Sequence, residues 1–287
     1  MDGKATVAKH PRQDHHVSDQ PRSHTLTGFV PGLRLTTSRW HLLLAPAFGS
    51  LMLLVWAAVA HTGWYASFIV PSPGSVADRW WQLATDGDLT RHIAVTLREV
   101  LTGLLLGVLA AFWLGYLIAK NRLAAYTLTP YLVALQAVPI VAIAPLLIIW
   151  FGPGIASKTI ICALLVFFPM LVNTIIGIRN IPPELRDLMR SLEATPLQTF
   201  WHLDLPAAMP IVIGGLKVSA TLSVIGAVVG EFVSASAGLG YLINFGRGTY
   251  DTPLVIAAVF TLTALALILY GLASWLEHIL LDWQEAQ

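Results

Sequence analysis

The chain has few charged residues and almost no cysteine. Only 11% of its 287 residues are Asp, Glu, Lys or Arg, whereas a soluble domain carries roughly 25%. Hydrophobic residues make up 56% and the mean hydropathy is +0.69, so the composition predicts an integral membrane protein. The single cysteine, Cys162, lies inside an apolar run and supports neither a disulfide framework nor a cysteine metal cluster. We expect it to behave as a small buried hydrophobic residue.

The sequence also lacks the motifs that several other classes of protein need. Without a Gly-x-x-x-x-Gly-Lys-[Ser/Thr] phosphate loop, the chain cannot bind ATP by that route. The absence of a His-x-x-x-His pair and of a Gly-x-Ser-x-Gly turn argues against a membrane enzyme. A net charge of +1, with no basic stripe carrying interleaved aromatic residues, argues against a nucleic-acid partner. We predict no cofactor and no metal site.

Residues 1–38 are polar and contain no apolar core of the kind found in a signal peptide. We predict a disordered cytoplasmic tail there and a transmembrane domain over residues 39–287. A helix needs about 20 apolar residues to cross the hydrocarbon layer. Six runs meet this requirement, so we predict an all-α integral membrane protein with six transmembrane helices, at about 41–61, 100–119, 126–150, 159–178, 207–234 and 252–276.

The third of these spans is expected to be irregular. The uncharged stretch 123–157 would measure about 52 Å as one straight helix, which is too long for a single crossing. Pro130, Pro139 and Pro145 interrupt it, so we predict one kinked crossing with an irregular outer end around 151–154. Lys and Arg residues are concentrated on the side that holds the N-terminal tail and residues 179–206. By the positive-inside rule, that side is cytoplasmic and both termini lie there.

Residues 179–206 form a charged island between two membrane-length apolar runs. Pro182 and Pro183 end the fourth span and can begin a new helix, because proline fits the first helical turn. An apolar stripe follows at helical spacing, formed by Leu185, Leu188, Met189 and Leu192. The island therefore predicts an amphipathic docking element, although a hairpin that merely joins two spans is the simpler alternative.

A second short helix is predicted at the end of the island. Thr195 is a candidate N-cap, Pro196 takes the first helical position, and Gln198 completes a capping box. We place a bend at Ala194–Thr195 and the end of this helix at Pro206.

Polar residues inside the apolar spans are candidate pathway residues. They are Gln136, Asn173, Thr174, Thr221, Ser223 and Glu231. A hydrogen bond between helices is the simpler interpretation for each. The fifth span also holds Lys217, which lies about 21 Å along the helix from Glu231 and cannot pair with it. A proton-coupled secondary transporter that uses Glu231 is an alternative, but it leaves the charged island unexplained.

The island resembles the cytoplasmic coupling loop of ABC importer permeases. That signature is Glu-Ala-Ala, three residues, Gly, nine residues and Ile-x-Leu-Pro. Aligning Leu205-Pro206 with its end puts Leu203 at the isoleucine, Glu193 at the glycine and Asp187-Leu188-Met189 at Glu-Ala-Ala. Both alanines and the glycine are thus replaced. Since the glycine would make the bend, we expect Thr195-Pro196 to turn the chain instead.

Other segments support the resemblance over about residues 65–280. Residues 138–152, 168–174, 230–232 and 238–242 resemble the sulfonate, taurine and nitrate permease branch, as does Val70-Pro-Ser-Pro73. Within that branch, 188–192 and 215–233 look most similar to permeases for heterocyclic vitamins and precursors, such as riboflavin or hydroxymethylpyrimidine. A sulfonate, taurine or nitrate importer remains the alternative.

The resemblance implies a type I importer permease fold in a bacterial inner membrane. Its implied partners are ATP-binding cassette ATPase subunits, an extracytoplasmic substrate-binding protein, membrane lipid and a second copy of the permease. This chain itself would be non-catalytic. The residues implied in ATPase coupling are Leu185, Arg186, Asp187, Leu188, Met189, Arg190, Glu193, Leu205 and Pro206, with docking across 184–202.

Overall fold

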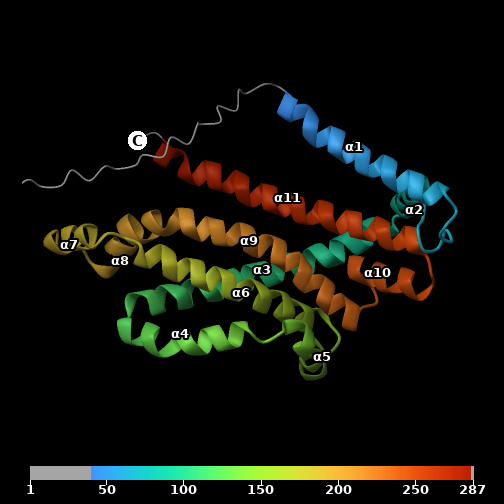
Figure 1. The fold of residues 1–287 in the computed structure, drawn as a ribbon. Helices are drawn as coiled ribbons and strands as arrows, with labels where there is room; N and C mark the ends of the chain where they lie inside the picture. The colour runs from blue at the N-terminus through green and yellow to red at the C-terminus, as the bar shows by residue number, and fades with distance from the viewer. Residues whose placement is uncertain (1–39, 286–287) are drawn as a thin grey trace, which may run out of the picture. The chain divides into compact units, whose positions relative to one another are not determined.

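A computed structural model describes residues 40–285, and every regular element in that range is helical. The predicted tail, 1–38, lies outside the described residues. The chain divides into two compact units, 1–48 and 49–287, and helix α1 (Trp40–His61) continues from the first into the second. The second unit holds the remaining helices (Figure 1): α2 Pro73–Thr85, α3 Asp88–Lys120, α4 Arg122–Gln136, α5 Ile140–Phe151, α6 Ile155–Arg179, α7 Pro183–Ser191, α8 Pro196–Thr199, π-helical turn η1 Phe200–Asp204, α9 Leu205–Val233, α10 Leu239–Gly248 and α11 Thr252–Glu285.

Within the described residues, four helical segments are long and apolar enough to cross a membrane. They are α3, α6, the continuous segment Pro196–Val233, and Thr252–Leu281 of α11. The bent pair α4 and α5 makes a fifth if it counts as one span, and Pro46–His61 of α1 is a shorter apolar helix. The all-helical, multi-span prediction is therefore confirmed, while the number six stays a prediction.

The predicted third span is broken rather than kinked. Helices α4 and α5 meet at 91°, so the interruption predicted within 126–150 is a break between two helices and not a kink in one helix, and the single crossing stays a prediction. The break lies at Ala137–Pro139. Pro139 has no N–H to continue the ladder of α4 and acts instead as the N-cap of α5. At the other end, Gly152 adopts φ 81° and separates α5 from α6, which confirms the irregular outer end predicted around 151–154.

Helix α3 begins 12 residues before the span predicted at 100–119. The additional turns contain Arg91, Arg98 and Glu99, which a hydropathy criterion excludes from a span. Inside the fold, Glu99 is 2% exposed and its carboxylate lies 3.1 Å from Nζ of Lys158 on α6. A partner on another helix, invisible in the local sequence, therefore allows the charged turns to pack.

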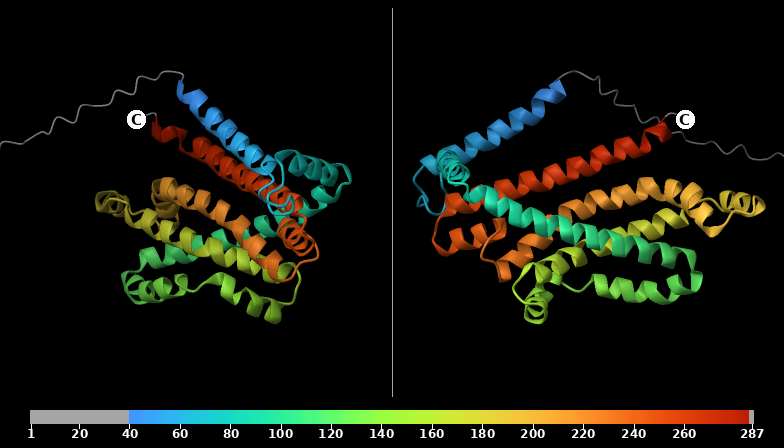
Figure 2. Two further views of the ribbon diagram at one scale, coloured as in Figure 1. Left: turned by 45° about the vertical axis from the view of Figure 1, so that its right-hand side comes forward. Right: turned by 180° about the vertical axis from the view of Figure 1, so that it is seen from behind.

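Three helices pack closely through small residues. Helix α6 packs along both α3 and α9, which also contact each other (Figure 1), and seen from behind, α3 runs obliquely across the bundle (Figure 2). A Cβ placed on Gly103 of α3 would lie 2.4 Å from Sγ of Cys162. A Cβ placed on Gly226 of α9 would lie 2.6 Å from Cα of Cys162. Cys162 is fully buried between them, which confirms its predicted packing role. Gly103 belongs to a four-residue repeat on α3: Gly103, Gly107, Ala111 and Gly115.

We expect Gly226→Ala to lower the free energy of unfolding by about 1–3 kcal/mol, because the added methyl meets the backbone of α6. Gly214→Ala on the same helix is the matched control, since a Cβ there has nothing within 4 Å. That control should be neutral or stabilising by up to about 1 kcal/mol. Denaturant unfolding in lipid–detergent micelles measures both, and equal effects would contradict the packing account.

Candidate functional site

The charged island folds into a compact element that we call the pad, residues 183–204. It consists of α7, α8 and η1, and α7 and α8 project past one end of the helix bundle, the end opposite α2 and α10 (Figure 1). Helix α7 begins at Pro183 and carries Glu184 in its first turn, as the sequence predicted.

The bend after α7 lies at Glu193, the position where the importer signature has glycine. Glu193 adopts φ 53°, in the left-handed region. Its N–H donates to the carbonyl of Arg190 (2.9 Å), and the N–H of Ala194 donates to the carbonyl of Met189 (3.0 Å). These two bonds form a Schellman C-cap, which glycine most often completes. The expectation that Thr195-Pro196 would replace the glycine was therefore wrong, because Glu193 takes the glycine conformation itself.

The second helix of the pad starts as predicted. The N–H of Gln198 donates to Oγ1 of Thr195 (3.3 Å), and Oε1 of Gln198 accepts from the N–H of Thr195 (2.8 Å). This is the complete capping box. The predicted end of the helix at Pro206 was wrong. The chain passes through η1, where the N–H of Leu205 donates to the carbonyl of Phe200, and continues as α9. The wider π turn accommodates Pro206, which has no N–H to donate to a helical hydrogen bond.

The pad is fixed to α3 by a buried carboxylate. Asp204 is fully buried, and its Oδ2 lies 2.6 Å from Nζ of Lys120 and accepts a hydrogen bond from the hydroxyl of Tyr116 (3.1 Å). Next to it, the ring of Phe200 packs edge-on against Tyr116 at 5.1 Å and stacks on Trp113 at 5.9 Å. Lys120 is partly exposed, but separating it from Asp204 would leave a fully buried carboxylate without its cation, so the pad and the end of α3 are expected to move together.

A second contact ties the pad to α6. The guanidinium of Arg186 on α7 donates to the carbonyl of Ile178 (2.5 Å) in the last turn of α6. By contrast, the pair between Arg190 and Asp187 is exposed on both sides and adds little stability. Leu205 and Pro206 form the first turn of α9. The pad is thereby attached to α3, α6 and α9, the three helices of the central packing.

The outer face of the pad is apolar and exposed. Its leucine and tryptophan side chains are 41–67% exposed, and they are Leu185, Leu188, Leu192, Leu197 and Trp201. Leu185, Leu188 and Leu192 lie among charged residues, outside the segments that are long and apolar enough to cross a membrane. Met189, predicted as part of the same stripe, is half-buried and lines a cavity of about 370 Å³ beside Tyr116 and Ala194. The exposed apolar surface is typical of a protein contact.

The candidate pathway residues do not gather at one place. Gln136 is exposed at the break between α4 and α5. Asn173 is half-buried on α6 and donates to the carbonyl of Pro169 in its own helix. Thr174, Thr221 and Ser223 also donate to carbonyls of their own helices.

Glu231 lies at the other end of the bundle from the pad, in a buried polar cluster. It is 1% exposed, accepts from the hydroxyl of Thr96 on α3 (2.6 Å), and also accepts from the N–H of Gly240 on α10. The N–H of Gly238 donates to Nδ1 of His92 (2.8 Å). A Cβ on Gly238 would lie 2.2 Å from the Glu231 carboxylate, so glycine, with φ 120°, is required there. The cluster joins α3, α9 and α10.

Lys217, the other charge of the fifth span, pairs with Glu277 on α11. Both charges of α9 can be read from the sequence, but neither partner can, because each partner comes from a distant segment of the chain.

The fold therefore has the features of a membrane subunit: a closely packed apolar bundle with an exposed apolar pad fixed to one end. Residues 103–280 match the family described as binding-protein-dependent transport system inner membrane component, and the chain belongs to this family. It is thus an ABC importer permease subunit, as the sequence resemblance predicted.

Three relatives illustrate the range of the family. The chain is 42% identical over 260 residues to the riboflavin transport system permease protein of Chloroflexus aurantiacus (90% of this chain, 97% of the relative). It is 34% identical over 244 residues to the formylaminopyrimidine transport permease protein of Halalkalibacterium halodurans (85% and 97%). It is 32% identical over 249 residues to a putative aliphatic sulfonates transport permease protein of Escherichia coli (86% and 95%).

Among solved structures, the chain resembles the MetNI methionine ABC transporter in inward-facing conformations. The TM-score is 0.59 at 18% identity, covering 67% of this chain and 95% of the other. This likeness shows that the two chains share a fold.

The backbone at Glu193 yields a prediction. A left-handed conformation costs a non-glycine residue about 1–2 kcal/mol, so Glu193→Gly should preserve the pad and raise stability by up to about 1 kcal/mol after the greater chain entropy of glycine is counted. Glu193→Val should destabilise, because a β-branched residue tolerates positive φ poorly. Unfolding temperatures of both variants in micelles test this, and a stable Val variant would refute the strain at this position.

The buried pair of Glu99 and Lys158 yields another. Lys158→Met leaves Glu99 buried without its cation, which should lower the free energy of unfolding by about 3–5 kcal/mol. The double variant with Glu99→Gln should recover much of this loss. Arg190→Met removes an exposed pair and should change stability by less than about 1 kcal/mol. If chemical unfolding shows no recovery of stability in the double variant, the ion pair between Glu99 and Lys158 is not the source of the loss.

Proposed function

We propose that this permease subunit carries a heterocyclic vitamin or vitamin precursor into the cell, such as riboflavin or a pyrimidine. The observation that supports this most strongly is the 42% identity to a riboflavin transport permease over 90% of the chain. The relative named for formylaminopyrimidine transport belongs to the same chemical class and ranks above the sulfonate relative in identity.

A sulfonate importer is the second candidate, since the sulfonate relative covers nearly as much of the chain. In either case a substrate-binding protein outside the membrane delivers the solute to a pair of permease copies with both termini in the cytoplasm. Ligand screening of the substrate-binding protein that delivers solute to this permease decides between the candidates. Binding of a flavin or pyrimidine with no binding of alkyl sulfonates supports the first, and the reverse result supports the second.

The pad is the proposed docking site of the ATPase subunits. Its exposed leucines would enter a cleft on the ATPase, and its contacts through Asp204 and Arg186 would pass the motion of the ATPase to α3 and α6. Closure of two ATPases on ATP would then rotate the helices as rigid bodies and switch the pathway between its inward and outward openings. Leu188, 53% exposed, lies within this docking face.

The candidate pathway residues stay Gln136, Asn173, Thr221 and Glu231. Gln136 is the best placed of them, because it is exposed at the end of α4, where the helix breaks. Glu231 is enclosed by α3 and α10 in this conformation. That enclosure argues against a proton-coupled secondary transporter, in which Glu231 would need access to water.

The docking proposal predicts the effect of a charge on the pad. Leu188→Asp should lower ATPase co-purification and solute-stimulated ATP hydrolysis at least about tenfold, because it buries a charge in an apolar contact. The matched control is Leu123→Asp, which changes a still more exposed leucine (71%) at the start of α4, outside the pad. Co-purification and uptake are measured for both. Normal uptake and normal co-purification of Leu188→Asp would eliminate docking at the pad.

A further inference from the structure

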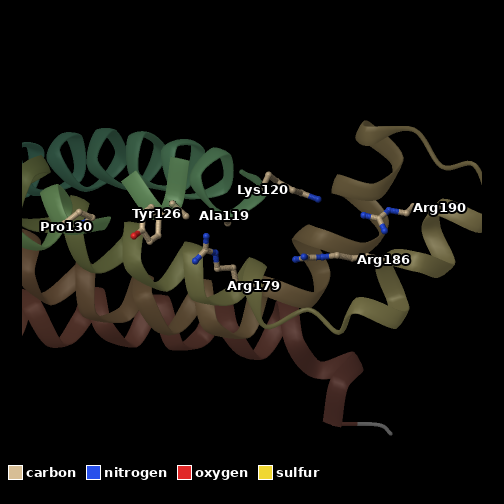
Figure 3. A pocket seen from close by; sticks show the side chains of 8 residues that line it. Ala119, Lys120, Tyr126, Pro130, Arg179, Arg186 and Arg190 are labelled. Carbon is tan, nitrogen blue, oxygen red and sulfur yellow. The ribbon is translucent and has the colours of Figure 1, made fainter. Parts of the chain in front are cut away.

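A large cationic cavity opens beside the pad. Its volume is about 1190 Å³, and it lies between the end of α3, the first turns of α4, the end of α6, and α7 (Figure 3). Its lining residues are Ala119, Lys120, Ala125, Tyr126, Pro130, Arg179, Arg186 and Arg190. Four of these eight residues are cations and none is acidic.

Two of the four positive charges have no carboxylate partner within the described residues. Lys120 is paired with Asp204, and Arg190 with Asp187. Arg179 forms no ion pair in the part of the chain that the structure describes. Arg186 donates from one nitrogen to a backbone carbonyl, while its Nε is buried without an acceptor. An unsatisfied buried N–H is unfavourable, so an acceptor at Arg186 would stabilise the fold.

The cavity is amphipathic along its length. The apolar and aromatic residues Pro130, Tyr126 and Ala119 lie toward one end, and Arg186 and Arg190 lie at the other (Figure 3). The site is located where the apolar helices α3 and α6 end, which is the depth of the lipid headgroups. Free phosphate would use only the cationic end, whereas a phospholipid would use both.

We propose that this cavity binds the phosphate group of an anionic phospholipid headgroup, with Arg179 and Arg186 as its principal donors. Guanidinium groups suit phosphate because their fork of N–H donors matches two phosphate oxygens. Basic pockets between spans on the cytoplasmic side are established sites for such headgroups. The inference goes beyond the proposed function and does not depend on the solute. A lipid bound here would join α3, α6 and α7, the elements that hold the pad.

The test compares the purified permease in nanodiscs of phosphatidylcholine alone and of phosphatidylcholine with phosphatidylglycerol. Retained phosphatidylglycerol is counted by native mass spectrometry after transfer to detergent, and the unfolding temperature is recorded. Arg179→Gln should weaken retention about fivefold, the loss expected for one cation near the membrane surface. Arg179 forms no ion pair with any residue that the structure describes, so the variant should still fold. Arg91→Gln, an exposed cation at the start of α3, is the matched control and should retain lipid normally.

A parallel sample in phosphatidylcholine alone receives inorganic phosphate. A stabilisation that needs phosphatidylglycerol and is lost in Arg179→Gln supports a lipid source. A stabilisation by inorganic phosphate with the same dependence on Arg179 supports the phosphate site but assigns it a soluble source. Retention and stability that are equal in Arg179→Gln and the parent overturn the proposal. The proposal is also overturned if ATPase binding depends on Arg179 while lipid retention does not, because the cavity would then receive an acidic protein surface.

Discussion

The close approach of α3 and α9 to α6 is the constraint on which the rest of this structure depends. Water drives no association inside a bilayer, so helices there pack through shape, and small residues let their backbones meet. Gly103 of α3 and Gly226 of α9 both approach Cys162 of α6, which leaves no room for a side chain at either glycine. Because α6 packs closely against both helices, the three helices behave as one body.

That body carries a polar connection at each end. At one end Asp204 and Arg186 attach the pad to α3 and α6. At the other end the Glu231 cluster attaches the start of α10 to α3 and α9, and Glu99 with Lys158 joins α3 to α6. A motion that enters at the pad therefore has a rigid route to the opposite end of the bundle, as rigid-body coupling requires.

Local patterns in the sequence predicted the parts of the fold that local physics decides. The apolar runs, the proline start of α7 and the capping box at Thr195 depend only on neighbouring residues, and they were found. The left-handed bend at Glu193 and the outward extension of α3 were missed, and the interruption at Pro139 was predicted as a kink although the helices meet at 91°. The bend depends on a glutamate that takes a conformation usual for glycine, and the extension of α3 depends on Lys158, a partner from another helix. The break depends on how far the chain turns at Pro139. The repeat Gly103, Gly107, Ala111 and Gly115 was a readable signal for the central packing.

The central claim is that the pad moves with α3 as one rigid body. Spin labels at Ser191 on the pad and Leu117 on α3 test it directly, since Cys162 is fully buried and will not take a label. The distance between the two labels is measured by electron paramagnetic resonance in the complex with the ATPase, without nucleotide and with trapped ATP. The account predicts that the distance from Ser191 to Leu117 within one permease is the same without nucleotide and with ATP. A distance from Ser191 to Leu117 that shifts with ATP would contradict it.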